Sequence, residues 1–162
     1  MYDNSLNFSE IAEQKSNFLT KNRLKGKEFV LATIHRDNNT DNPERLTAIF
    51  EALHIISSEH TVNIALPLHP RTKKLLEQSL PESLYKDISE NKHFVITDPA
   101  SFFDMIELEK HCALIATDSG GVQKESYFFE KQCIILRPQT EWVELVEHGT
   151  AIIADANRDR IV

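Results

Sequence analysis

Six short apolar runs alternate with helix-like segments along the 162 residues of this chain. Each run is apolar on both faces, which is typical of strands that helices cover on both sides of a sheet. The runs lie at residues 28–34, 62–68, 94–96, 112–117, 133–136 and 151–154. Parallel neighbouring strands require crossover connections, and the helical segments between the runs can supply them. The alternation therefore predicts an α/β fold with a doubly wound, Rossmann-like parallel sheet.

Helical periodicity and capping residues place helices before the first strand and between the strands. A leading helix is predicted over residues 7–24, with Ser9 as its cap and Gly26 as its stop. Pro43 is expected at the first position of the helix that follows the first strand. The other helices are expected around residues 75–80, at 101–110, from 120 to about 130, at 141–147 before Gly149, and from 157 onward.

A serine and two glycines, Ser119-Gly120-Gly121, stand where the fourth apolar run ends and a helix begins. Gly120 and Gly121 lack a Cβ atom, so they can take positive φ values and let another group approach the backbone. The first amides of a helix have no partners within it, and its positive end attracts anions. The turn therefore suits a phosphate group. A helix that only needs Ser119 as its N-cap explains the same residues equally well.

Polar side chains follow five of the six predicted strands directly. They are His35 and Arg36, His69 and Arg71, Asp98, Asp118 with Ser119, and Arg137 with Glu141. Ligands of doubly wound sheets bind beyond the carboxyl ends of the strands, so we expect these groups to form one site. The alternative is that they are scattered polar residues of surface loops.

Charge and hydropathy argue against two classes of partner. The formal net charge is −7 and no basic cluster appears, so nucleic-acid binding is not expected. No apolar run approaches the roughly 20 residues that a membrane span needs, and no leader segment is seen, so we expect a cytoplasmic protein. Cys112 and Cys133 lie in strand-like runs and are expected as buried thiols, with no zinc site.

Four motifs occur one after another along the chain. They are Thr33-Ile34-His35-Arg36 with Asn39-Thr40-Asp41, His69-Pro70, the segment Thr117 through Glu125, and Leu136-Arg137 with Thr140-Glu141. Together they resemble the carboxyl-terminal half of the UDP-N-acetylglucosamine 2-epimerase family, over nearly the whole chain. The segment Thr140-Glu141-Trp142-Val143-Glu144 is similar to the branch that acts on modified sugars such as UDP-2,3-diacetamido-2,3-dideoxyglucuronate.

The resemblance implies one half of a GT-B-like two-domain fold, with the nucleotide sugar in the cleft between two Rossmann-like halves. Residues 1–25 would be the inter-domain crossing and leading helix, and residues 26–162 the UDP-binding domain, truncated at its carboxyl end. The amino-terminal half would be missing, and the full-length protein would be a homodimer. The domain alone is expected to be inactive, because the principal acid and base carboxylates of the family belong to the other half.

The resemblance also implies a reaction and roles for particular residues. UDP would be eliminated across C1–C2 of the sugar and added again on the other face, which requires no metal and no nicotinamide cofactor. The amides of Ser119, Gly120 and Gly121 would stabilise the diphosphate as the C1–O bond breaks. Glu125 would accept hydrogen bonds from the ribose hydroxyls. His35 follows a strand and can be neutral or cationic near pH 7, so it is the candidate for catalysis or for diphosphate contact.

Each of the remaining candidate site residues has two interpretations. Arg36 is either a second anion contact or part of a structural ion pair. His69 and Arg71 would approach the uridine, and Phe102 the uracil, although an aromatic residue at a helix start is also typical of a core. Arg137 and Glu141 either contact phosphate or sugar, or pair with each other.

One position departs from the family pattern His-Arg-x-Glu-Asn. This chain has His35-Arg36-Asp37-Asn38-Asn39, so a carboxylate is absent at Asn38. Three other functions stay open from the sequence: a hydrolysing 2-epimerase, a GT-B glycosyltransferase domain, and a nucleotide-binding module without enzymatic activity.

Overall fold

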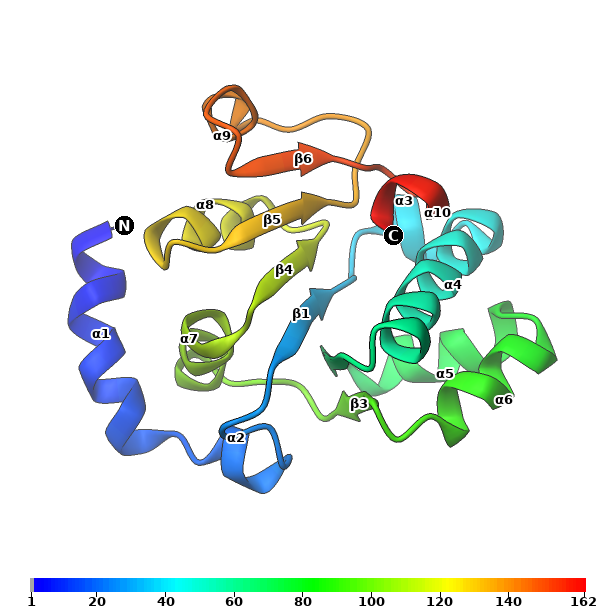
Figure 1. Cartoon of the computed structure of the whole chain (residues 1–162), viewed down its shortest axis with the longest axis horizontal. Coiled ribbons are helices and arrows are strands. Elements are labelled where there is room, and N and C mark those ends of the chain that lie inside the picture. The colour runs from blue at the N-terminus through cyan, green and yellow to red at the C-terminus, as the bar shows by residue number, and fades with distance from the viewer. Residues whose placement is uncertain (1) are drawn as a thin grey trace.

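A computed structural model of the chain describes residues 2–162, which form a six-stranded parallel sheet in the order β3-β2-β1-β4-β5-β6. The strands are β1 (Phe29–Thr33), β2 (Asn63–Pro67), β3 (Phe94–Thr97), β4 (Leu114–Thr117), β5 (Gln132–Ile135) and β6 (Ala151–Ile153). Figure 1 shows the common direction of β1, β4, β5 and β6, and β1 and β4 are the two central strands of the sheet. The predicted doubly wound parallel sheet is confirmed.

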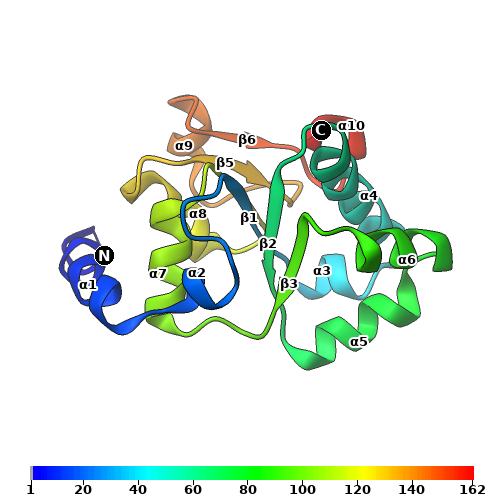
Figure 2. The same ribbon diagram turned by 60° about the horizontal axis from the view of Figure 1, so that its bottom comes forward.

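Helices cover both faces of this sheet. They are α1 (Tyr2–Lys15), α2 (Phe18–Lys21), α3 (Asp37–Thr40), α4 (Pro43–Glu59), α5 (Pro70–Ser79), α6 (Glu82–Glu90), α7 (Phe102–His111), α8 (Gly120–Phe128), α9 (Val143–Glu147) and α10 (Arg158–Ile161). Figure 2 separates the two groups, with α4, α6 and α10 on one side of the sheet and α7 and α8 on the other. Within residues 2–162, no helix combines the length and the apolar composition needed to cross a bilayer.

The central strand β1 explains why the sequence pattern is apolar on both faces. All five of its residues are buried. Val30 and Ala32 belong to the core beneath α4, whereas Phe29 and Leu31 belong to the opposite core with Leu108 of α7. Full burial of one such large side chain stabilises the fold by about 2 kcal/mol.

The predicted single leading helix over residues 7–24 is wrong. The structure has two helices, α1 and α2, and Ser9 lies inside α1 instead of capping it. The break follows from a contact distant in sequence: the Ser16 hydroxyl donates to Oδ1 of Asp104 at 2.6 Å and accepts from the amide of Phe18 at 3.3 Å. These bonds compete with the helical ladder at the break.

Two further helices were not expected from the sequence. The polar segment after β1 contains α3, and the segment after β2 forms two helices, α5 and α6. Leu80 takes an extended conformation, with φ −80° and ψ 148°, between these two helices. The following Pro81 enforces this geometry, because the residue before a proline is disfavoured in the helical region.

Several expected helix boundaries are confirmed. Pro43 opens α4, and the side chain of Asn42 caps it by accepting from the amides of Glu44 and Arg45 at 3.1 and 3.2 Å. Gly149 follows the end of α9 with φ +73°, a value that favours glycine. Positive φ values do not occur at Gly120 or Gly121, so the turn before α8 does not use that freedom.

Candidate functional site

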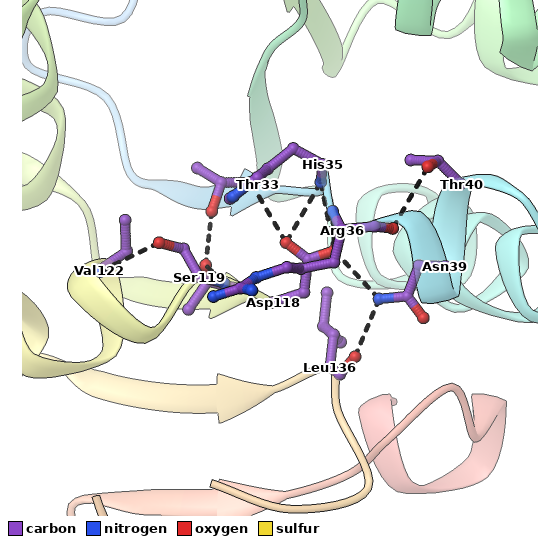
Figure 3. A network of polar contacts seen from close by, with 10 residues as sticks. Thr33, His35, Arg36, Asn39, Thr40, Asp118, Ser119, Val122 and Leu136 are labelled. Atoms are coloured by element: carbon purple, nitrogen blue, oxygen red, sulfur yellow. Dashed lines mark hydrogen bonds and ion pairs between the residues drawn. The ribbon is translucent and has the colours of Figure 1, made fainter. Parts of the chain in front are cut away.

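The candidate site lies at the carboxyl ends of β1 and β4. These strands are neighbours, and the chain proceeds from them to opposite edges of the sheet, so the loops after them meet at the switch point of the topology. Thr33 and Thr117 are register partners at the two strand ends, and their hydroxyl oxygens lie 2.6 Å apart. The two loops therefore start level with each other (Figure 3).

Asp118 organises the loop after β1. Its carboxylate is fully buried and accepts from the backbone amides of His35 at 3.2 Å and of Arg36 at 3.0 Å. It also accepts from Nδ2 of Asn39 at 3.1 Å. The sequence indicated Asp118 only as one of several polar residues after strands, because its partners are about 80 residues away. The structure makes it the residue that fixes where His35 and Arg36 stand.

The same carboxylate orients His35. Oδ1 of Asp118 lies 3.3 Å from Nδ1 of His35, whose side chain is 57% exposed. When one imidazole nitrogen faces a carboxylate, the tautomer is set and the other nitrogen, Nε2, stays available for a ligand. The structure therefore holds His35 as an oriented polar group at the carboxyl end of β1.

Asn39 joins three loops at this edge of the sheet. It is fully buried, and besides Asp118 its Nδ2 donates to the carbonyl of Leu136 at 2.9 Å, while its Oδ1 accepts from Nε of Arg45 at 3.1 Å. The sequence did not suggest this role, although Asn39 is part of the motif that begins with His35. The departure at Asn38 falls on an exposed neighbour of this buried residue.

The start of α8 is capped by Ser119 and still leaves backbone donors unused. Ser119 caps the helix, since its hydroxyl accepts from the amide of Val122 at 3.4 Å, and its own amide donates to Oγ1 of Thr117 at 2.9 Å. Within the described part of the chain, the amides of Gly120 and Gly121 have no acceptor. The cap therefore leaves two donors free at the positive end of the helix.

The segment after β5 packs against this turn. Nε1 of Trp142 donates to the carbonyl of Gly120 at 2.8 Å. A Cβ atom added at Gly120 would lie 3.5 Å from Oε2 of Glu141, whereas one added at Gly121 would meet nothing nearer than 3.8 Å. Packing alone consequently does not require glycine at position 121, which leaves the approach of a ligand as a reason for it.

Glu141 links two arginines to this turn. Arg137 forms two hydrogen bonds of 3.0 Å with the carboxylate of Glu141. These bonds lower the pKa of Glu141, and the charge of the exposed Arg36 acts in the same direction. A cleft of about 340 Å³ is lined by Arg36, Asn38 and Arg137. Arg137 and Glu141 therefore pair with each other in this structure, which is the second of the two interpretations given for them above.

His69 and Arg71 differ in their surroundings. Nδ1 of His69 accepts from the amide of Arg71 at 3.2 Å, so this histidine caps α5. Arg71 lines a second cleft, of about 390 Å³, together with His35 and Asp37. The structure thus brings Arg71 into the neighbourhood of His35 and gives His69 a structural role as well.

Glu125 and Phe102 contact residues of neighbouring helices. The carboxyl group of Glu125, on α8, contacts that of Glu109, which is 1% exposed. Burial, followed by this neighbouring carboxylate, raises the pKa of Glu109 to about 10. Phe102 is 57% exposed at the start of α7 and packs edge to face on Phe8 of α1, at 5.3 Å between ring centroids. It is not a core residue.

Metal-type ligands do not gather at this edge of the sheet in the described structure. The group of three that does come together among residues 2–162 is Glu13, Glu107 and His111, next to the amino-terminal ends of the strands. What the carboxyl edge offers instead is a pair of free amides, two arginines and an oriented histidine. This set of donors suits a doubly charged phosphate ester or a diphosphate.

Comparison with known proteins identifies relatives along the whole chain. The family model described as UDP-N-acetylglucosamine 2-epimerase matches residues 1–162. A UDP-2,3-diacetamido-2,3-dideoxy-D-glucuronate 2-epimerase from Pseudomonas aeruginosa is 45% identical over 137 residues, which are 83% of this chain and 35% of the relative. A UDP-GlcNAc 2-epimerase from Methanocaldococcus jannaschii, solved in complex with UDP-GlcNAc and UDP, has a TM-score of 0.86 at 36% identity, over 99% of this chain and 43% of that one.

A more distant likeness concerns the fold alone. E. coli heptosyltransferase WaaC with ADP has a TM-score of 0.51 at 10% identity over 72% of this chain and 36% of that one. The chain spans only about a third to under half of the length of these relatives. The expected α/β fold class and the resemblance stated from the motifs are both confirmed: this chain belongs to the UDP-N-acetylglucosamine 2-epimerase family.

Proposed function

We propose that this chain is the UDP-binding part of a UDP-sugar 2-epimerase, an isomerase. The observation that carries the proposal is the pair of free amides at Gly120 and Gly121, at the switch point of the sheet, with Glu141 linking Arg137 and Arg36 to the same turn. The Methanocaldococcus relative, whose structure holds UDP-GlcNAc and UDP, supports the same ligand class. Chemistry, fold and family therefore agree on a nucleoside diphosphate sugar.

The arrangement suits the departure of UDP from the sugar. Cleavage of the C1–O bond puts negative charge on the diphosphate, and the amides of Gly120 and Gly121 stabilise that charge most when it is fully developed. Arg36 and Arg137 add positive charge at the same place. The same groups then hold UDP while it adds to the other face of the acetamidoglycal, so no part of this route draws on a metal or a nicotinamide cofactor.

His35 is proposed to act at the diphosphate or at the reacting sugar. Its orientation by Asp118 is the arrangement expected of a residue whose Nε2 contacts a ligand. Glu125 is proposed to accept from the ribose hydroxyls, Arg71 and His69 to lie toward the uridine, and Phe102 toward the uracil. Glu141 is proposed to keep Arg137 in place until the substrate arrives.

The two clefts at this edge of the sheet, of about 390 and 340 Å³, are in keeping with a site of which this chain supplies one half. We propose that residues 1–25 are the inter-domain crossing, residues 26–162 the UDP-binding domain, and that a second Rossmann-like half supplies the missing wall and the acid and base carboxylates. A homodimer is proposed for the longer protein. Cys112 and Cys133 are buried and unpaired, which is typical of a reducing compartment and supports a cytoplasmic location.

The substrate is proposed to be UDP-N-acetylglucosamine or a modified sugar such as the 2,3-diacetamido uronic acid. The second alternative is favoured by the 45% identity with the Pseudomonas enzyme and by Trp142-Val143 at the Gly120 turn. Product analysis of the longer protein with both substrates separates these two, and release of free sugar would identify a hydrolysing enzyme. A requirement for an acceptor sugar would identify a glycosyltransferase.

Calorimetric titration of UDP into the 162-residue chain tests the site. We expect measurable binding to the wild type, weaker than in a protein with both halves, and none to Gly121→Val, whose side chain would occupy the place of the phosphate. Because a Cβ at Gly121 meets nothing nearer than 3.8 Å, the variant should fold, which thermal unfolding verifies. Wild-type protein that binds no UDP, or a folded Gly121→Val that binds it equally well, would overturn the proposal.

A further inference from the structure

A second concave feature lies at the amino-terminal edge of the sheet, on the side remote from His35. It is a cavity of about 570 Å³ between α1, α2, the turn before β1 and the end of α7. Its lining includes Glu13, Glu107 and His111. The proposed binding of UDP uses none of these three side chains.

Glu107 and His111 form one half of a chelating pair. They are four residues apart in the last turn of α7, so their side chains lie on the same face of the helix. Nε2 of His111 is 3.4 Å from Oε2 of Glu107. Two ligands at this helical spacing can bind one metal ion, as in the His-x-x-x-His pairs of zinc enzymes.

The burial of Glu107 requires an explanation. Its side chain is only 9% exposed, and its Oε1 atom is buried without a hydrogen-bond partner in the described structure. A buried carboxylate oxygen with no partner costs free energy, which a bound cation recovers. Glu107 lines the cavity. Its unpartnered oxygen therefore points to a bound cation, independently of the clustering of the three ligands.

Glu13 of α1 supplies a third ligand from across the cavity. One ligand atom from each of the three side chains lies within 4.8 Å of the other two. Zinc-ligand bonds of about 2.0–2.2 Å require somewhat closer ligand atoms. The side chain of Glu13 is 53% exposed and so has room for the small rotation that brings them together.

We propose that Glu13, Glu107 and His111 bind a divalent transition-metal ion such as Zn²⁺, which ties α1 to the end of α7. Two carboxylate oxygens and one imidazole nitrogen form a ligand set that zinc accepts, and water completes the tetrahedron. The negative end of α7, which terminates at His111, also favours a cation. The site is structural, and it does not depend on the binding of UDP.

Three lysines compete with the ion. Lys110 pairs with Glu13, and Lys25 and Lys27 line the same cavity. Only Oε1 of Glu13 contacts Lys110, so Oε2 remains for the metal. Removal of this competitor in Lys110→Met should therefore strengthen binding several-fold.

Titration of the metal-free chain with Co²⁺ and Zn²⁺ tests the site. We expect one Co²⁺ per chain with the strong visible absorption of a four-coordinate ion, displaced by Zn²⁺. A hundredfold excess of Zn²⁺ over its dissociation constant should raise the thermal midpoint by roughly 5–10 °C. Glu107→Gln and the exposed Glu13→Gln should each weaken binding at least tenfold while the chain stays folded.

A matched control is present in α9. Glu144 and His148 have the same spacing of four residues, but both are exposed, and no third metal-type ligand joins them among residues 2–162. The double variant Glu144→Gln, His148→Gln should bind the ion as the wild type does. Absence of stoichiometric binding, binding that survives Glu107→Gln and Glu13→Gln, or binding lost in the α9 control would each overturn the proposal. None of these results bears on UDP, which is measured separately.

Discussion

Oδ1 of Asp118 lies 3.3 Å from Nδ1 of His35, and the same buried carboxylate accepts the backbone amide of that histidine. The residue that would face the ligand is therefore held through both its main chain and its side chain by one residue, Asp118, directly after the neighbouring strand β4. Changes at Asp118 should alter folding and ligand binding together.

Asp118→Ala is expected to lower the unfolding free energy by about 3 kcal/mol, because it leaves the amides of His35 and Arg36 and the side chain of Asn39 without their acceptor. Urea denaturation measures this loss. Asp159→Asn, at a side chain that is 88% exposed, is the control and should stay within about 0.5 kcal/mol of the wild type. Equal stability of the two variants would contradict the role of Asp118.

Stability should fall as pH rises through the neutral range because of Glu109. Its pKa is raised from the ordinary 4.5 to about 10, so between these values the folded chain keeps a proton that the unfolded chain has released. The contribution of this group is complete below pH 4.5 and is lost as pH rises toward 10, at a rate of about 1 kcal/mol per pH unit.

Glu109→Gln removes this titration. As the pH rises from 5 to 9, the variant should gain roughly 4 kcal/mol of unfolding free energy relative to the wild type. Denaturant titrations at several pH values measure the difference, with the exposed Glu77→Gln as control. Parallel pH profiles for the wild type and Glu109→Gln would show that Glu109 is ionised in the folded chain.

Arg137→Ala should weaken UDP binding about tenfold, and the loss should shrink at high salt, since the arginine acts through its charge. Its pair with Glu141 is largely exposed on the carboxylate side, so stability should change by less than about 1 kcal/mol. Calorimetric titration with UDP at two salt concentrations measures the affinity and its dependence on salt. Arg158→Ala, on α10, should leave the affinity for UDP unchanged, and a similar loss there would indicate a general charge effect.

Both cysteines should be unreactive in the folded chain. Burial raises the pKa of Cys112 and of Cys133 to about 12, and the thiolate is the reactive form. A thiol reagent such as Ellman's should label neither cysteine in native buffer and both in concentrated guanidinium. Rapid native labelling would show that the strands near Cys112 or Cys133 open readily.

The fold could be predicted because its signals are local. Apolar runs such as Phe29–Thr33 and helix starts such as Pro43 depend on neighbouring residues, and parallel strands then dictate the topology. The break after α1 could not be predicted, because it depends on Ser16 meeting Asp104, 88 positions away. The division of α5 from α6 could have been predicted, since Pro81 marks it.

The residues of the candidate site also fall into those that the local sequence predicts and those that it does not. His35, Arg36 and Ser119 were placed correctly at one edge of the sheet because each directly follows a strand. The supporting residues Asp118 and Asn39 acquire their roles only through the pairing of β1 with β4. The contact between Glu125 and Glu109 likewise joins two helices and leaves no trace in the local sequence.

Trp142 is the single tryptophan of the chain, and its indole donates to the carbonyl of Gly120 with the ammonium of Lys124 4.5 Å from its ring centre. An indole next to the candidate phosphate contact is a native optical reporter. Its emission should change when an anion reaches the start of α8, so occupancy of the site can be followed by fluorescence without a label.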